Sequence, residues 1–251
     1  MVNLIPVVKK YEYPSLQRKD LGWPEGRRYI YGDQKLPSVT TIISKTKDTE
    51  GLDAWAERIG KENAEKIKND AAAVGTHMHN VIERMVAYRD LPRPTNWLMT
   101  KGYEMGYRLV NTYFSNINEI WGSEVSVYYS HKYAGTTDMI GLYKGKLAVI
   151  DFKQSKKPKK VEWIEDYFHQ LAAYALAHDK LFDTEINFGV ILVSVQDGTT
   201  QEFTTTGYEF ENYKKAWLKR VDDFYAEGGL PAPNTGSNGN KNHTKIYFGI
   251  K

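Results

Sequence analysis

The sequence predicts a fold of the α/β class, of α+β type, in which a central mixed β-sheet is flanked by helices. Apolar side chains recur at helical spacing through much of residues 53–118. Polar and apolar residues then alternate through residues 123–153, which are rich in Val, Ile, Tyr and Thr, as is typical of a small antiparallel sheet. A further helical stretch, residues 161–180, separates this region from two more strand-like segments, INFGVILVSV and TTQEFTTTGY.

We expect residues 1–251 to form a single domain, because 41% of them are hydrophobic, enough for a sizeable core. Residues 1–36 are an N-terminal segment with a short hairpin. The hairpin leads into a further extended piece, which ends in LPSVTTII at residues 36–43. Residues 37–120 are predicted to be mainly helical, with a break near residues 73–75 and a third helix over residues 97–118. Residues 121–230 hold the sheet and its helices, including the amphipathic NYKKAWLKRVDDFYAEG, and the Gly-, Asn- and Ser-rich residues 231–251 are expected to form a mobile tail.

The composition excludes several kinds of site. Cysteine is absent, which rules out disulfides, thiolate zinc sites, iron–sulfur clusters and cysteine nucleophiles. Carboxylates and histidines remain as strong metal ligands, and they favour a hard cation, Mg²⁺ or Mn²⁺. The net charge is only +3, so composition alone does not indicate a nucleic-acid partner. The sequence has no signal-peptide pattern and no run of about 18 apolar residues, so we expect a soluble protein of the cytoplasm.

Two carboxylates are predicted to face each other across a hairpin. A turn centred on residues 144–145 pairs Tyr143 with Lys146, and the same register continued outward places Asp138 opposite Asp151. Residues directly opposite in an antiparallel pair have Cβ atoms about 5 Å apart. Like charges at this distance repel, so the pair requires a cation or a raised pKa, and a divalent ion supplies the cation.

Lys153 is predicted to lie beside this carboxylate pair. It follows Asp151 by two residues and shares its face of the strand, while Phe152 points to the opposite, buried face. An ammonium group there can stabilise charge on a phosphate, or help to position and deprotonate a water, and phosphodiester hydrolysis needs both. An ordinary surface hairpin with solvated charges is the alternative. The apolar run LAVIDFK argues against it, because it delivers the charges to the end of a central strand.

Residues from other elements are candidates to complete the site. His79 and Glu83 are four residues apart on one helix, where the imidazole is a candidate metal ligand and Glu83 a supporting acid. His77 points to a different side and is the weaker candidate. Glu124 precedes the hairpin and is either beside its carboxylates or a surface acid. Gln170 and Tyr174 share a helix face, and on their own they fit a half-buried packing surface equally well.

Five motifs follow one another along the chain: G-T-x-x-H-x-x-x-E at residues 75–83, a strand Glu at 124, G-T-x-D at 135–138, D-x-K at 151–153 and Q-x-x-x-Y at 170–174. Their order resembles the RecB-like branch of the PD-(D/E)XK nuclease superfamily. LPSVTTII and LDAWAERIG further resemble the family of the mitochondrial genome maintenance exonuclease, which has phage-encoded relatives.

The resemblance implies a restriction-endonuclease-like core with an N-terminal helical elaboration, and a Mg²⁺- or Mn²⁺-dependent DNA exonuclease that acts on free single-stranded ends. It implies a phage-type role in DNA replication, recombination or degradation. The superfamily's proline is absent, since Thr137 precedes Asp138. The implied metal ligands are His79, Asp138, Asp151 and the Phe152 carbonyl, with Lys153 as the catalytic lysine and Gln170 and Tyr174 supporting the site or holding the DNA strand.

Basic residues near the predicted site are candidates for phosphate contacts. Two alternative functions stay open from the sequence: a structure-specific or restriction-type endonuclease, and a non-catalytic DNA-binding module that assists recombination. Intact carboxylates and the lysine argue against the second. The candidate DNA-binding residues are Lys156, Lys157, Lys159 and Lys160 after the strand, together with Arg27, Arg28, Arg58 and Arg84.

Overall fold

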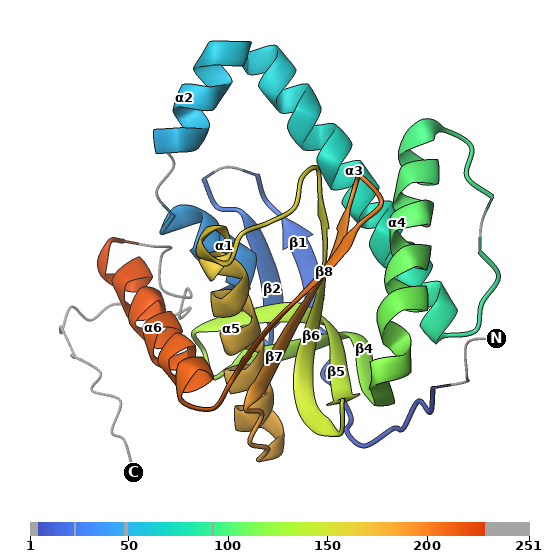
Figure 1. Cartoon of the computed structure of the whole chain (residues 1–251). Helices are drawn as coiled ribbons and strands as arrows, with labels where there is room; N and C mark the ends of the chain where they lie inside the picture. Colours follow the sequence, from blue (N-terminus) through green and yellow to red (C-terminus); the bar gives the residue numbers. More distant parts are fainter. Residues whose placement is uncertain (1–4, 23, 48–49, 92, 229–251) are drawn as a thin grey trace.

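A five-stranded mixed sheet with the order β4-β5-β6-β7-β8 forms the centre of the computed structural model, which describes residues 5–228 except 23, 48–49 and 92 (Figure 1). Strand β6 pairs with β7 in parallel, and the other neighbours are antiparallel. Helix α5 makes the crossover that a parallel pair requires. The strands are β4 (Ile117–Tyr129), β5 (Tyr133–Tyr143), β6 (Lys146–Ser155), β7 (Phe188–Val195) and β8 (Thr200–Thr206), and α5 is Glu165–Phe182. The predicted central mixed sheet is confirmed.

The β5–β6 hairpin has the predicted register. Its pairs run from Tyr143 with Lys146 to Met139 with Ile150. Both turn residues have positive φ, 49° at Lys144 and 76° at Gly145, as the tight two-residue turn of a hairpin demands. The next position outward in this register is occupied by the two aspartates of the candidate site.

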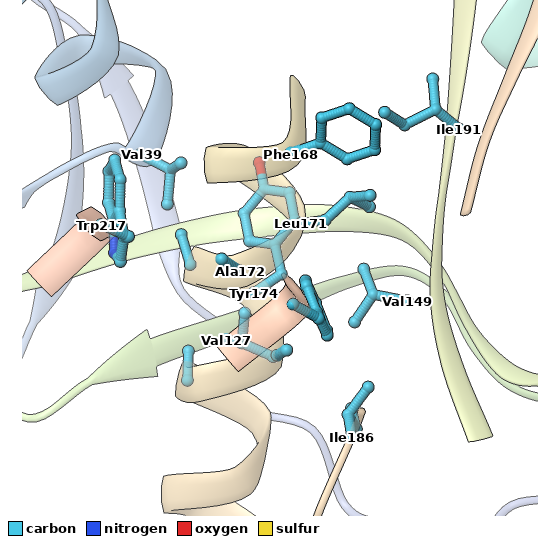
Figure 2. Packing of buried hydrophobic residues seen from close by; sticks show 14 of the residues in the cluster. Val39, Val127, Val149, Phe168, Leu171, Ala172, Tyr174, Ile186, Ile191 and Trp217 are labelled. Atoms are coloured by element: carbon cyan, nitrogen blue, oxygen red, sulfur yellow. The ribbon is translucent and has the colours of Figure 1, made fainter. Parts of the chain in front are cut away.

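Helices cover both faces of the sheet. Helices α5 and α6 (Gly207–Ala226) lie on one face, and α3 (Lys61–Val86) and α4 (Trp97–Tyr113) on the other (Figure 1). The side chains of β6 alternate accordingly, since Val149 packs with the α5 side, and Ile150 and Phe152 with the α3 side. Figure 2 shows part of the cluster on the α5 face, to which Val127 and Val149 of the sheet and Leu171 of α5 belong.

Two glycines bring α4 into close contact with α3. A Cβ atom at Gly102 would lie 2.7 Å from the Val74 carbonyl oxygen, and one at Gly106 would lie 2.8 Å from that of Met78. Only glycine allows this approach. The contact fixes α3 against the sheet and thereby positions the residue that follows Met78, His79.

The N-terminal part forms a separate antiparallel sheet of β1 (Gln17–Asp20), β2 (Arg27–Tyr31) and β3 (Gln34–Pro37). The predicted hairpin is confirmed, but the expected extended structure of SVTTII is wrong. These residues form helix α1 (Val39–Lys45), because the Ser38 hydroxyl accepts a hydrogen bond from the Thr41 N–H at 3.0 Å and caps the helix.

The predicted helix break near residues 73–75 is also wrong. The break lies at Gly60, with a φ of 87°, between α2 (Glu50–Ile59) and α3. Helix α2 and the start of α3 meet in a bend that projects beyond the sheet (Figure 1). The third helix ends at Tyr113, and β4 begins at Ile117, before the predicted boundary at 120.

The predicted tail over residues 231–251 lies outside the described residues, so the single domain over 1–251 stays a prediction. Among the described residues, every helix is too short or too polar to cross a bilayer.

Candidate active site

Three carboxylates form a row across β4, β5 and β6. The pairs on either side of Glu124 and Asp138 place these two residues opposite each other, and the hairpin register places Asp138 beside Asp151. The Asp138 Oδ2 atom accepts a hydrogen bond from the Phe152 N–H at 2.8 Å, which fixes that carboxylate against β6. Glu124 has a φ of 52°, a strained conformation for a residue with a side chain, and such strain is frequent at functional sites.

His79 of α3 completes a group of three donors. Its Nδ1 atom lies 3.6 Å from Asp138 Oδ2 and 3.8 Å from Glu124 Oε1. One ligand atom of each residue lies within 4.8 Å of the others. A nitrogen and two carboxylate oxygens at this spacing suit a divalent cation.

The charge on His79 depends on these carboxylates. Burial disfavours the imidazolium, but the nearby carboxylates of Asp138 and Glu124 outweigh burial and raise the His79 pKa to about 9. The ring is therefore protonated at neutral pH without a cation. A metal that uses its nitrogen must displace that proton.

Asp151 supports the fit of a cation more strongly. Its side chain is 1% exposed, and neither carboxylate oxygen has a hydrogen-bond partner among the described residues. Lys153 Nζ lies 2.6 Å from Asp151 Oδ2 and forms an ion pair with it. Burial raises the Asp151 pKa to about 6, even against the opposing effect of the ammonium. A buried carboxylate of this kind fits a site for positive charge.

Lys153 is held as a cation by a chain of polar contacts. Burial alone would lower its pKa, but the carboxylates of Asp151 and Asp138 raise it. Its Nζ donates to Gln170 Oε1 at 3.0 Å, and Gln170 Nε2 donates to the Tyr174 hydroxyl at 3.2 Å. The residues of the predicted Q-x-x-x-Y motif therefore position the lysine. A permanently charged ammonium favours charge stabilisation over proton abstraction.

Tyr174 is seated over a glycine of β5. Its side chain is buried among the residues of Figure 2, near Val39 and Leu171. A Cβ atom at Gly135 would lie 2.6 Å from Tyr174 Cε1, closer than side chains approach. The glycine of the G-T-x-D motif therefore makes room for the tyrosine that ends the polar chain.

The sequence comparison decides the family. A family model described as the PD-(D/E)XK nuclease superfamily matches residues 50–236, which include every residue of the group above. The chain belongs to the PD-(D/E)XK nuclease superfamily. The predicted resemblance is confirmed.

Three relatives of this chain carry one name. Mitochondrial genome maintenance exonuclease 1 of Xenopus tropicalis is 29% identical over an alignment of 204 residues, and the alignment covers 75% of this chain and 57% of that protein. The proteins of that name in Mus musculus and Homo sapiens are 27% and 26% identical, again over 75% of this chain, and over 59% and 58% of their own lengths. The chain therefore spans less than two thirds of the length of these curated relatives.

Two solved structures are similar to this chain at lower identity. The structure of SSO0001 matches 77% of this chain and 76% of its own, with 16% identity and a TM-score of 0.42. A protein from Eubacterium rectale matches 64% of this chain and 69% of its own, with 10% identity and a TM-score of 0.45. At these scores neither neighbour bears on function.

Some predicted residues lie outside the group. Glu83 is exposed on α3 and is not part of the three-donor group, and His77 packs against Gly102 of α4. The structure thus separates Glu83 from the site, although it lies one turn from His79. The role predicted for the Phe152 carbonyl stays a prediction, since the contact shown here is made by its N–H.

The basic candidates for phosphate contacts differ in their surroundings. Lys156 and Lys159 line a cavity next to the candidate site. Arg28 is 6% exposed and donates to the backbone carbonyls of Glu25 and Lys35, which removes it from a phosphate's reach. The others are placed as follows: Arg27 pairs with Asp20, Arg84 donates to Asn80 and to the Asp90 carbonyl, Arg58 is exposed on α2, the Lys157 carbonyl accepts from Ser155, and Lys160 lies over the ring of Trp163.

Sequence reasoning left one feature of the site open and missed another. The sequence offers Glu124 as a supporting acid that lies either beside the hairpin carboxylates or at the surface, and the structure places one of its carboxylate oxygens within 4.8 Å of a ligand atom of His79 and of Asp138. Tyr167 was not considered, yet its ring centroid lies 5.1 Å from Lys153 Nζ. The spacing of Tyr167 and Gln170, three residues apart on α5, is the signal that indicates a shared face.

Proposed function

We propose that this chain is a Mg²⁺- or Mn²⁺-dependent DNA exonuclease that hydrolyses phosphodiester bonds from free DNA ends. The observation that carries the proposal is the buried Asp151 carboxylate, with no hydrogen-bond partner among the described residues, beside Asp138 and the Lys153 ammonium. Two adjacent carboxylates next to a fixed ammonium group suit the hydrolysis of a phosphodiester, whose negative charge increases during the reaction.

The chain's own residues have distinct roles in this proposal. His79, Glu124 and Asp138 would hold the cation, with Asp151 next to Asp138 in the row. When bound, the cation supplies Lewis acidity and lowers the pKa of a water ligand. Asp138 stays oriented because the Phe152 N–H donates to it. Gln170 and Asp151 hold Lys153 Nζ in place. In this position Lys153 stabilises negative charge on the phosphate oxygens.

DNA as the substrate and attack from an end are supported by the name that three relatives share, mitochondrial genome maintenance exonuclease 1. A free single-stranded end and a phage-type role in replication, recombination or degradation belong to the proposal and rest on the motif order. The cytoplasm is likewise a proposed location, and the relatives' name associates those proteins with a different compartment.

Digestion of linear and circular DNA tests the proposal. End-labelled linear single strands and covalently closed single-stranded circles are incubated with the protein in Mg²⁺, Mn²⁺ or EDTA. We expect release of label from linear DNA with either cation, intact circles, and no reaction in EDTA. Cutting of circles would show an endonuclease, and cleavage in EDTA would refute metal dependence.

A further inference from the structure

A cavity of about 400 Å³ adjoins the candidate active site. Residues of α3, the start of α4, the end of β6 and the loop after it, and α5 line the cavity. Tyr167 belongs to both places, because it lines the cavity and its ring lies 5.1 Å from Lys153 Nζ. A ligand in the cavity would therefore be an immediate neighbour of the reacting phosphate.

The cavity offers stacking surfaces. Trp97, at the start of α4, lines it and is 62% exposed, although a large apolar ring is normally buried. Tyr167 contributes a second aromatic ring to the lining. Aromatic rings stack on nucleic-acid bases regardless of sequence, because every base has a π-face.

The polar lining suits a base attached to a backbone phosphate. The Gln154 Oε1 atom is buried and lacks a hydrogen-bond partner among the described residues, while its Nε2 donates to the Ala71 carbonyl. This acceptor, with the Asp70 carboxylate in the same lining, fits the N–H donors on base edges and disfavours a bare phosphate. Lys156 and Lys159 supply the positive charge that a backbone phosphate requires.

The size of the cavity favours an unpaired nucleotide. Small-molecule sites typically measure about 300–1,000 Å³, so this one has room for a single nucleotide and not for a duplex. A base within a duplex would have to leave its stack and its pairing partner to enter the cavity, and this step costs free energy. An unpaired base enters without that cost.

We propose that this cavity binds the base of one unpaired nucleotide next to the scissile phosphate, with Trp97 as the stacking residue. The proposal rests on the proposed nuclease function. It adds a defined subsite, and it predicts that single strands are preferred because the subsite needs a free base.

Abasic scanning of a substrate tests the subsite. Linear single-stranded oligonucleotides each carry one tetrahydrofuran abasic residue, moved stepwise from the end, and kcat/KM is measured for each with Mg²⁺. We expect the wild type to show a drop of roughly 10- to 100-fold at one position, the range for one base stacked on an aromatic ring. Trp97→Ala should lower kcat/KM on intact DNA by a similar factor. It should show no further drop on the oligonucleotide with the abasic residue at that position, whereas Trp97→Phe should keep part of this drop.

Trp163 provides a matched control, because it is 61% exposed and does not line the cavity. Trp163→Ala should keep the position-dependent drop. The subsite is refuted if Trp97→Ala retains the full drop, or if Trp163→Ala loses it equally. Cleavage without any position-dependent drop would refute the subsite and leave the nuclease proposal intact. If no DNA is cleaved, the nuclease proposal fails. The subsite is then tested by the affinity for the same oligonucleotides, measured by fluorescence anisotropy in EDTA and compared between the wild type, Trp97→Ala and Trp163→Ala.

Discussion

Replacing Gly135 by alanine should destabilise the protein and impair its site. The new Cβ atom would lie 2.6 Å from Tyr174 Cε1 and 3.4 Å from Val39 Cγ2. Tyr174 is only 3% exposed, so its ring cannot move into solvent without opening the core. Overpacking of this kind costs about 1–3 kcal/mol in free energy of unfolding.

Gly75 is the matched control, since it belongs to the other G-T motif. A Cβ atom there would lie 3.8 Å from Gln154 Cγ, an ordinary contact, inside helix α3. Gly75→Ala should therefore stabilise the protein by about 1 kcal/mol through helix propensity. Urea unfolding, with unchanged m-values, measures both changes.

The coupling between Gly135 and Tyr174 can be measured directly. Tyr174→Leu removes the crowded ring, so the double variant should cost less than the sum of the two single variants. Gly135→Ala should also lower the rate of DNA cleavage under conditions in which the variant is fully folded. The reason is that a shifted Tyr174 disturbs Gln170, which holds Lys153. Wild-type stability of Gly135→Ala, or strict additivity in the double variant, would refute the packing described above.

Three further predictions concern charge. Because the carboxylates hold a proton on His79, Mn²⁺ binding near pH 7.5 should release about one proton, measured by calorimetry in buffers of different ionisation enthalpy; no release would contradict the imidazole ligand. Glu124→Gln should weaken Mn²⁺ binding at least about tenfold, whereas Glu83→Gln, which alters an exposed acid outside the group, should not; equal effects would contradict the assignment. Burial lowers the pKa of His178 to about 4, so its contribution to stability is complete above the unfolded value near pH 6.5 and is lost as the pH falls toward 4. The loss is about 3 kcal/mol, and urea unfolding of His178→Asn should show a flatter pH dependence than the wild type in that window.

The parts of the site that depend on local rules could be predicted. Residues 144–145 carry a turn signal, so the register that joins Asp138 to Asp151 followed from counting. The turn between β4 and β5 has no such signal, because Ser130, and not glycine, takes the positive φ of 49°. The register that brings Glu124 opposite Asp138 could therefore not be counted from the sequence, which left the place of Glu124 open.

Tertiary context decided other features. The β-branched run SVTTII favours a strand by propensity, yet the Ser38 cap and the burial of Val39 and Ile42 make it helix α1. The distance between His79 and the hairpin depends on how α4 packs on α3 through its glycines. Helical spacing places Glu83 one turn from His79 as a supporting acid, and only the packing shows that this exposed acid lies outside the three-donor group.

Cleavage by two site variants tests the central claim most directly. Asp151→Asn removes the charge of the buried carboxylate with little change in shape, and Lys153→Ala removes the ammonium group 2.6 Å from it. Release of label from end-labelled linear single-stranded DNA is measured in Mg²⁺ and Mn²⁺, with circular dichroism to confirm that each variant is folded. We predict that the wild type cleaves and that both folded variants do not. Wild-type cleavage rates in both variants would contradict the assignment of this site.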